Sequence, residues 1–104
     1  MRKFGAIALG LTFVGLISMP PSHLLAYSGE KYAKDAKVSI DEARTIALQA
    51  RTGTFTDEEL EHEKGGSGLR YSFDIKSADG LYEVGVDAQT GNVLENKKEG
   101  PHPD

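Results

Sequence analysis

The segment from Leu69 to Asp87 constrains the fold most, because apolar and polar residues alternate in it on both sides of a turn. The alternation is strict from Leu69 to Lys76, and a period of two is typical of a half-buried antiparallel strand. Asp79–Gly80 is a strong hairpin signal, and the alternation resumes after it. Two paired strands are therefore predicted, with these side chains on the buried face: Leu69, Tyr71, Phe73, Ile75, Tyr82, Val84 and Val86.

Further strands are predicted on both sides of this hairpin. After it, Thr90–Gly91–Asn92 marks a turn and Val93–Leu94 begins a short last strand. Before it, residues 54–64 read TFTDEELEHEK, and the GGSG turn at 65–68 joins them to the hairpin. We favour a strand there, although helix is a rival interpretation for its Glu-rich part. Phe55 and Leu60 have opposite parity, so this strand either carries a bulge or starts late.

Residues 39–50 form the best helix candidate. Ser39 and Glu42 have the spacing of a capping box, which satisfies free backbone N–H groups at a helix start. Gly53 is placed to end the helix in a left-handed conformation. Apolar residues at helical spacing make one Ala-rich stripe, which suits close packing on a sheet: Ile40, Ala43, Ile46, Ala47 and Ala50.

The predicted fold class is α+β, with one N-terminal helix packed on a three- to four-stranded antiparallel sheet. The domain is expected at residues 38–95, after a spacer or helix extension at 29–37, and residues 96–104 are expected to be a disordered polar tail. Gly85 marks a bulge or a close approach on the face away from the helix. That face is polar and carries Arg70, Ser72, Asp74, Lys76 and Glu83.

Residues 1–28 read as a secretory signal peptide. Arg2 and Lys3 precede a nearly apolar run of 14 residues, Phe4–Ile17, which is shorter than the about 20 residues of a spanning helix. Cleavage is expected after Ala26 or Ser28, and the second site fits the small-x-small rule better. The alternative is an uncleaved anchor. Cleavage after Ser28 removes two of the 12 basic residues and no acidic one, which leaves 76 residues with a charge of −6.

Composition excludes several function classes. The chain has 104 residues and no Cys, which rules out disulfides, thiol catalysis and thiolate zinc sites. Its charge of −4 argues against general nucleic-acid binding. No Ser/His/Asp spacing or phosphate-binding motif is present, and His62 is flanked by residues that point to the opposite strand face. No catalytic residue, metal ligand or cofactor is therefore assigned, and the chain is expected not to be an enzyme.

The acidic strand is the candidate partner-binding element. Asp57, Glu59, Glu61 and Glu63 share one predicted strand face, and their charge favours a basic partner. An exposed edge at this strand would allow an extended partner chain to add to the sheet. Two other interpretations stay open, namely a weak Ca²⁺ or Mg²⁺ site and a charged edge that discourages aggregation. Asp87, Thr90 and Gly91 are interpreted as structural turn residues, since Asp accepts nearby backbone N–H groups.

Residues 38–94 resemble the PepSY domain. The resemblance rests on four pieces in order: VSIDEARTIALQA at 38–50, LEHE at 60–63, YSFDIK at 71–76 and YEVGVDAQTGNVL at 82–94. The GGSG loop is longer than the turn that family members often have. The resemblance implies a secreted or cell-envelope module of the kind found in metallopeptidase propeptides, where it is proposed to inhibit or regulate peptidases. No peptidase domain follows in this sequence, so action in trans is expected.

Two functions from different classes are therefore expected. The first is protein-binding regulation of a secreted or periplasmic peptidase. The second is an extracytoplasmic sensor that binds a ligand or cation at the acidic strand. Pairing of two copies through sheet edges, or by exchange of the helix, is a third hypothesis. Neither nucleic acid nor, after signal cleavage, a membrane is expected as a partner.

Overall fold

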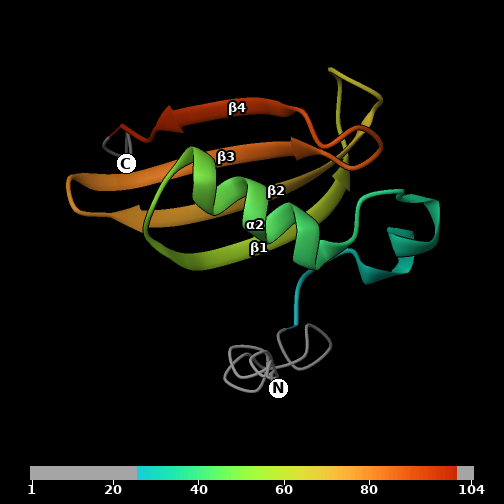
Figure 1. Cartoon of the computed structure of the whole chain (residues 1–104), viewed down its shortest axis with the longest axis horizontal. Helices are drawn as coiled ribbons and strands as arrows, with labels where there is room; N and C mark the ends of the chain where they lie inside the picture. The colour runs from blue at the N-terminus through green and yellow to red at the C-terminus, as the bar shows by residue number, and fades with distance from the viewer. Residues whose placement is uncertain (1–25, 101–104) are drawn as a thin grey trace, which may run out of the picture.

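The structure, a computed structural model, describes residues 26–100 and has one α-helix packed on a four-stranded antiparallel sheet (Figure 1). The strand order is β1-β2-β3-β4, so every strand pairs with its neighbour in sequence. This confirms the predicted α+β class. The signal-peptide prediction falls largely on residues outside the described range. The elements are the 3-10 helix η3 (Glu30–Asp35), α2 (Ile40–Ala50), β1 (Thr54–His62), β2 (Leu69–Ser77), β3 (Gly80–Asp87) and β4 (Val93–Lys98).

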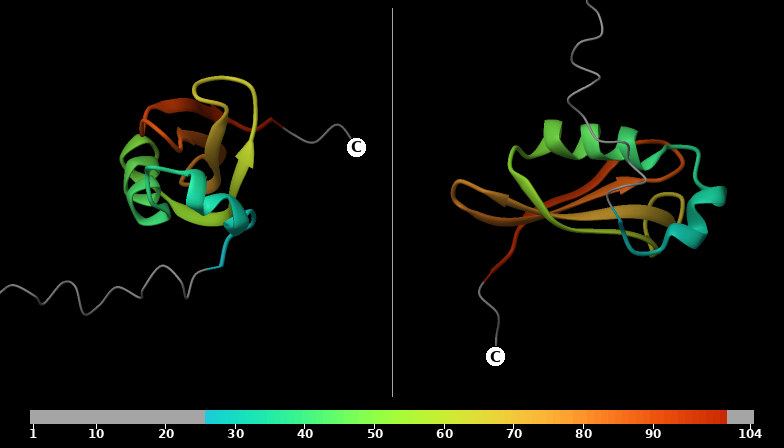
Figure 2. Two further views of the ribbon diagram at one scale, coloured as in Figure 1. Left: turned by 90° about the vertical axis from the view of Figure 1, so that its right-hand side faces the viewer. Right: turned by 90° about the horizontal axis from the view of Figure 1, so that it is seen from below.

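The core lies between α2 and one face of the sheet. Figure 2 shows α2 on one side of the sheet, and no described helix or strand over the other. Ala43 and Ala47 are fully buried, and their short side chains let the helix approach the sheet closely. The Tyr71 hydroxyl donates a 2.6 Å hydrogen bond to the Val38 carbonyl, and burial raises the pKa of Tyr71 to about 12. The strands contribute Leu60, Leu69, Tyr71, Phe73, Ile75, Val84 and Val86.

The helix starts as predicted and ends differently. The Ser39 side chain accepts from the Glu42 N–H at 3.1 Å, and the Glu42 carboxylate accepts from the Ser39 N–H at 2.9 Å. The helix ends at Arg51 in extended backbone, and Gly53 has no positive φ, so its predicted role as a left-handed cap is wrong. Gly53 instead makes room for β2, because a Cβ there would lie 2.3 Å from the Lys76 carbonyl oxygen.

A bulge in β1 resolves the parity conflict between Phe55 and Leu60. The pairing with β2 shifts between Phe55 and Asp57. Phe55 and Leu60 can therefore both face the core, and Phe55 lies 5.0 Å from Phe73 between ring centroids. From Asp57 onward β1 is regular, so the bulge sets which acidic side chains face away from the helix.

The ends of the domain are more ordered than the sequence indicated. Residues 30–35 of the predicted spacer form η3. β4 continues to Lys98, three residues into the predicted tail, and the Glu99 N–H still donates to the Leu81 carbonyl at 2.8 Å. Pairing with β3 holds residues 96–98 in a strand although apolar and polar residues do not alternate there. Among residues 26–100, no helix is long and apolar enough to cross a membrane.

Candidate functional site

The side of the sheet opposite α2 is strongly acidic. The register places Asp57 beside Asp74 and Asp74 beside Glu83, and paired side chains in a sheet point to the same side. Three cations, Arg70, Lys76 and Lys97, lie on the same side. We call this surface the acidic face, and its carboxylates are Asp57, Glu59, Glu61, Asp74, Glu83, Glu95 and Glu99.

Three of the four sequence-predicted partner-binding residues lie on the acidic face. Asp57 is exposed there, and Glu59 and Glu61 are half-buried. Glu63 follows the end of β1, where its N–H donates to the Gly68 carbonyl. The sequence also placed Asp74 and Glu83 on the polar face away from the helix, without assigning them to a site. Glu95 and Glu99 join the face through pairing with β3, which short-range patterns do not specify.

The edge of β1 is less open than the sequence suggested. Ser28 forms a parallel bridge with Glu59, with hydrogen bonds of 3.1 Å from the Ser28 N–H to the Glu58 carbonyl and 2.8 Å from the Leu60 N–H to the Ser28 carbonyl. Addition of a partner strand at the middle of β1 would therefore require displacement of this segment. A shallow groove of about 350 Å³ remains beside it, lined by Ala26, Tyr27, Ser28, Phe55, Thr56, Asp57 and Glu58.

Three carboxylates from neighbouring strands converge at one end of the acidic face. Asp74, Glu83 and Glu99 can each offer an oxygen within 4.8 Å of the others. Burial raises the pKa of Asp74, with Glu99 and Asp57 adding to the shift. Burial, Glu95 and Asp74 likewise raise the pKa of Glu83. Oxygen ligands of this kind suit Ca²⁺ or Mg²⁺. Burial and mutual repulsion account for these raised pKa values, whereas a bound cation would lower them.

Two polar residues of β2 on the acidic face, Arg70 and Ser72, are buried. The Arg70 guanidinium contacts Glu95 at 3.3 Å and donates to the Lys64 carbonyl at 3.0 Å. Gly85 makes room for it, since a Cβ there would lie 3.1 Å from Nη1, and the pairing of β3 with β4 shifts between Gly85 and Val86. Both predicted alternatives, a close approach and a bulge, are therefore present at Gly85. The Ser72 hydroxyl donates to Glu61 at 2.7 Å. The sequence predicted that these residues lie on a polar face, but it does not reveal that their side chains bond across strands and become buried.

Asp87 is a structural anchor at one end of the sheet. It is 1% exposed and accepts from the backbone N–H groups of Ser67, Gln89 and Thr90 and from the Ser67 hydroxyl, at 2.6 to 3.1 Å. Burial favours its neutral form, but these hydrogen bonds outweigh burial and lower the pKa of Asp87 to about 2. Gly91 takes a positive φ of 82° in the same turn. The GGSG loop is thereby tied to the β3–β4 turn.

The same network does not activate Ser67 for catalysis. A carboxylate with a lowered pKa is a weak base, and a nucleophilic serine needs a base that accepts its proton near neutral pH. His62, the histidine of the described residues, ends β1 opposite Leu69, and its ring packs edge-on against Tyr32 with centroids 4.7 Å apart.

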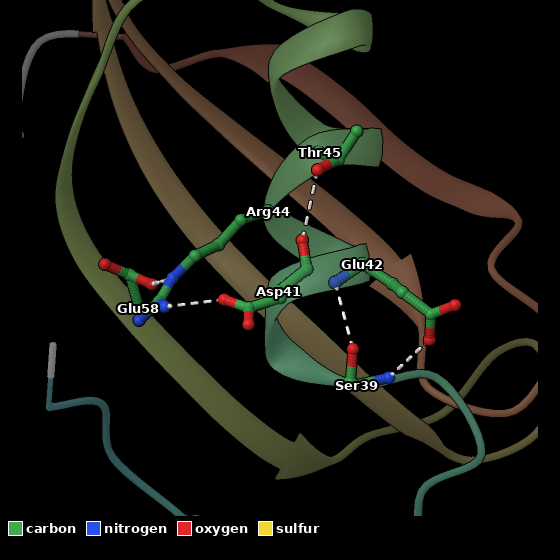
Figure 3. A network of polar contacts seen from close by, with 6 residues as sticks. All are labelled: Ser39, Asp41, Glu42, Arg44, Thr45 and Glu58. Carbon is green, nitrogen blue, oxygen red and sulfur yellow. Dashed lines mark hydrogen bonds and ion pairs between the residues drawn. The ribbon is translucent and has the colours of Figure 1, made fainter. Parts of the chain in front are cut away.

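A buried ion pair fixes α2 to β1 on the opposite side of the sheet (Figure 3). Arg44 Nε donates to Glu58 Oε1 at 2.5 Å, and the exposed fractions of the two side chains are 9% and 13%. Asp41 lies 3.6 Å from Arg44 Nη1. The predicted apolar stripe did not include Arg44. Glu58 faces the helix and is therefore absent from the acidic face.

Comparison with models of known protein families gives one match. A sequence model described as PepSY, the peptidase propeptide and YPEB domain, matches residues 37–97. The chain belongs to the PepSY family. This match covers more than half of the chain, including α2 and all four strands except Lys98. PepSY domains are associated with peptidase propeptides and regulation rather than catalysis, and they are generally exported modules. No curated protein and no solved structure matches significantly.

Proposed function

We propose that this PepSY domain is an exported, non-enzymatic module that regulates or inhibits a peptidase in trans, by protein–protein contact at the acidic face. The observation that carries the proposal is the concentration of seven carboxylates on the sheet side that no described element covers. Glu95 pairs with Arg70 and Glu61 with Ser72. The carboxylates that remain for a partner are Asp57, Glu59, Asp74, Glu83 and Glu99.

The charge of this face selects the chemistry of the partner. A basic surface would be steered toward it, and contact would relieve the carboxylate repulsion that adds to burial in raising the pKa values of Asp74 and Glu83. The partner is then a peptidase with Lys and Arg residues around its substrate-binding region.

The test combines capture with an inhibition assay. Exported proteins of the source cells are passed over the immobilised protein, and each captured peptidase is assayed with increasing amounts of it. We expect saturable inhibition that weakens about tenfold between about 0.05 and 0.3 M NaCl. The double variant Asp57→Asn/Glu83→Gln should also weaken inhibition about tenfold, measured at the lower salt concentration. Glu30→Gln/Asp35→Asn removes two exposed charges from η3 and is the matched control. Equal inhibition by both variants, or capture of no peptidase, contradicts the proposal.

The convergence of Asp74, Glu83 and Glu99 favours a second candidate, an extracytoplasmic sensor that binds a cation. Calorimetric titration with Ca²⁺ separates this candidate from the first. A saturable heat with one ion per chain that disappears in Glu83→Gln supports the sensor. Absence of heat at millimolar Ca²⁺ excludes a physiological extracellular calcium site of this kind.

A further inference from the structure

The two edges of the sheet differ in their availability. The middle of the β1 edge is occupied by Ser28, whose backbone bonds to Glu58 and Leu60. β4 is the other outer strand, and no segment within residues 26–100 pairs with its outer side. An unpaired edge of this kind exposes backbone donors and acceptors that can bond to another strand.

The outward-facing backbone groups of β4 follow from its pairing with β3. The Glu99 N–H donates inward to the Leu81 carbonyl, and directions alternate along an antiparallel strand. The backbone groups of Asn96 and Lys98 therefore point outward. The Asn96 side chain is turned toward α2, where it donates to the Ala50 carbonyl at 3.1 Å and accepts from Arg51 at 3.2 Å. Its backbone edge is left uncovered by its own side chain.

The charged side chains of β4 are arranged so that two antiparallel copies of this strand can pair opposite charges. Glu95 and Lys97 lie two residues apart on the acidic face. Glu95 contacts Arg70 through Oε1, at 3.3 Å, so its second oxygen, Oε2, is the one that would meet a cation of another strand. If two β4 strands run antiparallel with Asn96 opposite Asn96, Lys97 of each copy lies opposite Glu95 of the other. A shift of two residues in one direction places Glu95 opposite Glu95, and in the other it places Lys97 opposite Lys97. Like charges directly opposite each other are destabilising, so the two attractive pairs select one register.

We propose that β4 pairs antiparallel with β4 of a second copy, centred on Asn96, to form an eight-stranded sheet. The two-fold axis is perpendicular to the sheet, so both helices lie on one side and both acidic faces on the other. Lysines on an edge strand ordinarily discourage pairing. Here Lys97 meets a carboxylate in the second copy, which is why a second copy is favoured over an unrelated extended chain. The dimer is independent of the proposed peptidase regulation.

Charge exchange tests the register. The full chain, purified as exported by expressing cells, is measured by light scattering over a range of concentrations, and the mass should approach two chains. Lys97→Glu and Glu95→Lys should each raise the dimer dissociation constant about tenfold, because both interstrand pairs become repulsive. An equimolar mixture of the two variants should regain dimer, since both pairs are then attractive. Lys76→Glu makes the same charge change on β2 and should leave the dimer unchanged.

A backbone test is independent of charge. Lys98→Pro removes an N–H that points away from β3, so the internal ladder is kept while the proposed interface loses a donor. We expect this variant to be monomeric with an unchanged circular dichroism spectrum. In the wild type, hydrogen exchange at the Asn96 and Lys98 amides should slow as concentration rises. One-chain mass at all concentrations, a mixture of charge variants that stays monomeric, or concentration-independent exchange overturns the proposal.

Discussion

At the scale of single residues, Asp87 shows how one buried carboxylate holds two loops together. It accepts four hydrogen bonds, two of them from Ser67 in the GGSG loop. In Asp87→Asn, the side-chain NH₂ group would replace one carboxylate oxygen, so a donor would face the N–H and O–H donors that now bond to Asp87. We therefore expect the free energy of unfolding at pH 7 to fall by about 2–3 kcal/mol, measured by urea denaturation. Thr45→Ala, which loses only an exposed 3.2 Å bond to the Asp41 carbonyl, is a control and should change little.

The pH dependence of this effect follows from the pKa of Asp87. That pKa is about 2 in the folded chain, below its ordinary value of 3.8. The stabilisation by the ionised group is therefore fully present above about pH 4 and is lost as the pH falls through about 2. The stability gap between wild type and Asp87→Asn should narrow across this window. A gap that stays constant from pH 5 to about 2 would mean that folding does not lower the pKa of Asp87.

Residue roles were predictable from the sequence where they depend on neighbours in the chain. Ser39 and Glu42 form their capping box across three residues, and Asp87 bonds to N–H groups two and three residues on. Arg44 was missed because its burial depends on Glu58, fourteen residues away on another element. Gly53 was assigned the wrong role because a glycine is needed there to leave space for the backbone of β2, and not to adopt a positive φ.

At the scale of elements, the segment before η3 belongs to the fold. Tyr27 packs against Tyr71 with ring centroids 6.4 Å apart, and Ser28 bonds to β1. Cleavage after Ser28 would leave the Glu58 carbonyl and the Leu60 N–H without these partners. We therefore expect export processing after Ala26, although the small-x-small rule fits Ser28 better. The intact mass of the exported protein should equal that of a chain that begins at Tyr27. A mass that equals that of a chain beginning at Gly29 would contradict this.

A thermodynamic comparison tests the same segment without export. A chain that starts at Gly29 should be less stable than one that starts at Tyr27 by about 1–2 kcal/mol, because two backbone hydrogen bonds are lost. Tyr27→Ala in the longer chain separates ring packing from backbone pairing, since it keeps both Ser28 bonds. Equal stability of the two chains would show that Ser28 contributes nothing to the β1 edge.

Elements with a strong internal period were predictable, and those fixed by pairing were not. The helix at 40–50 and the hairpin of β2 and β3 match the predicted ranges closely, because their apolar residues repeat at 3.6 and 2. β4 ends at Lys98 rather than before Asn96, since an edge strand with polar side chains has no such period. η3 has no buried residue, so nothing in its sequence distinguished it from a spacer.

At the scale of the whole molecule, the acidic face opposes folding at neutral pH. The pKa values of Asp74 and Glu83 are raised, first by burial and then by neighbouring carboxylates. Such groups bind protons more readily in the folded chain, so stability increases as pH falls from 7 toward about 4. Below that range, protonation of Asp87 acts in the opposite direction. A stability maximum on the acid side of neutrality follows from these two opposing effects.

Asp74→Asn/Glu83→Gln isolates the contribution of the acidic face. This variant should be more stable than wild type at pH 7, and the difference should shrink toward about pH 4, where the wild-type carboxyls become neutral. Added NaCl should stabilise wild type more than the variant, because it screens repulsion that the variant lacks. Glu30→Gln/Asp35→Asn should follow wild type in both measurements. A variant less stable than wild type at pH 7 would mean that these carboxylates stabilise the fold. The acidic face would then contain no net repulsion for a basic partner to relieve.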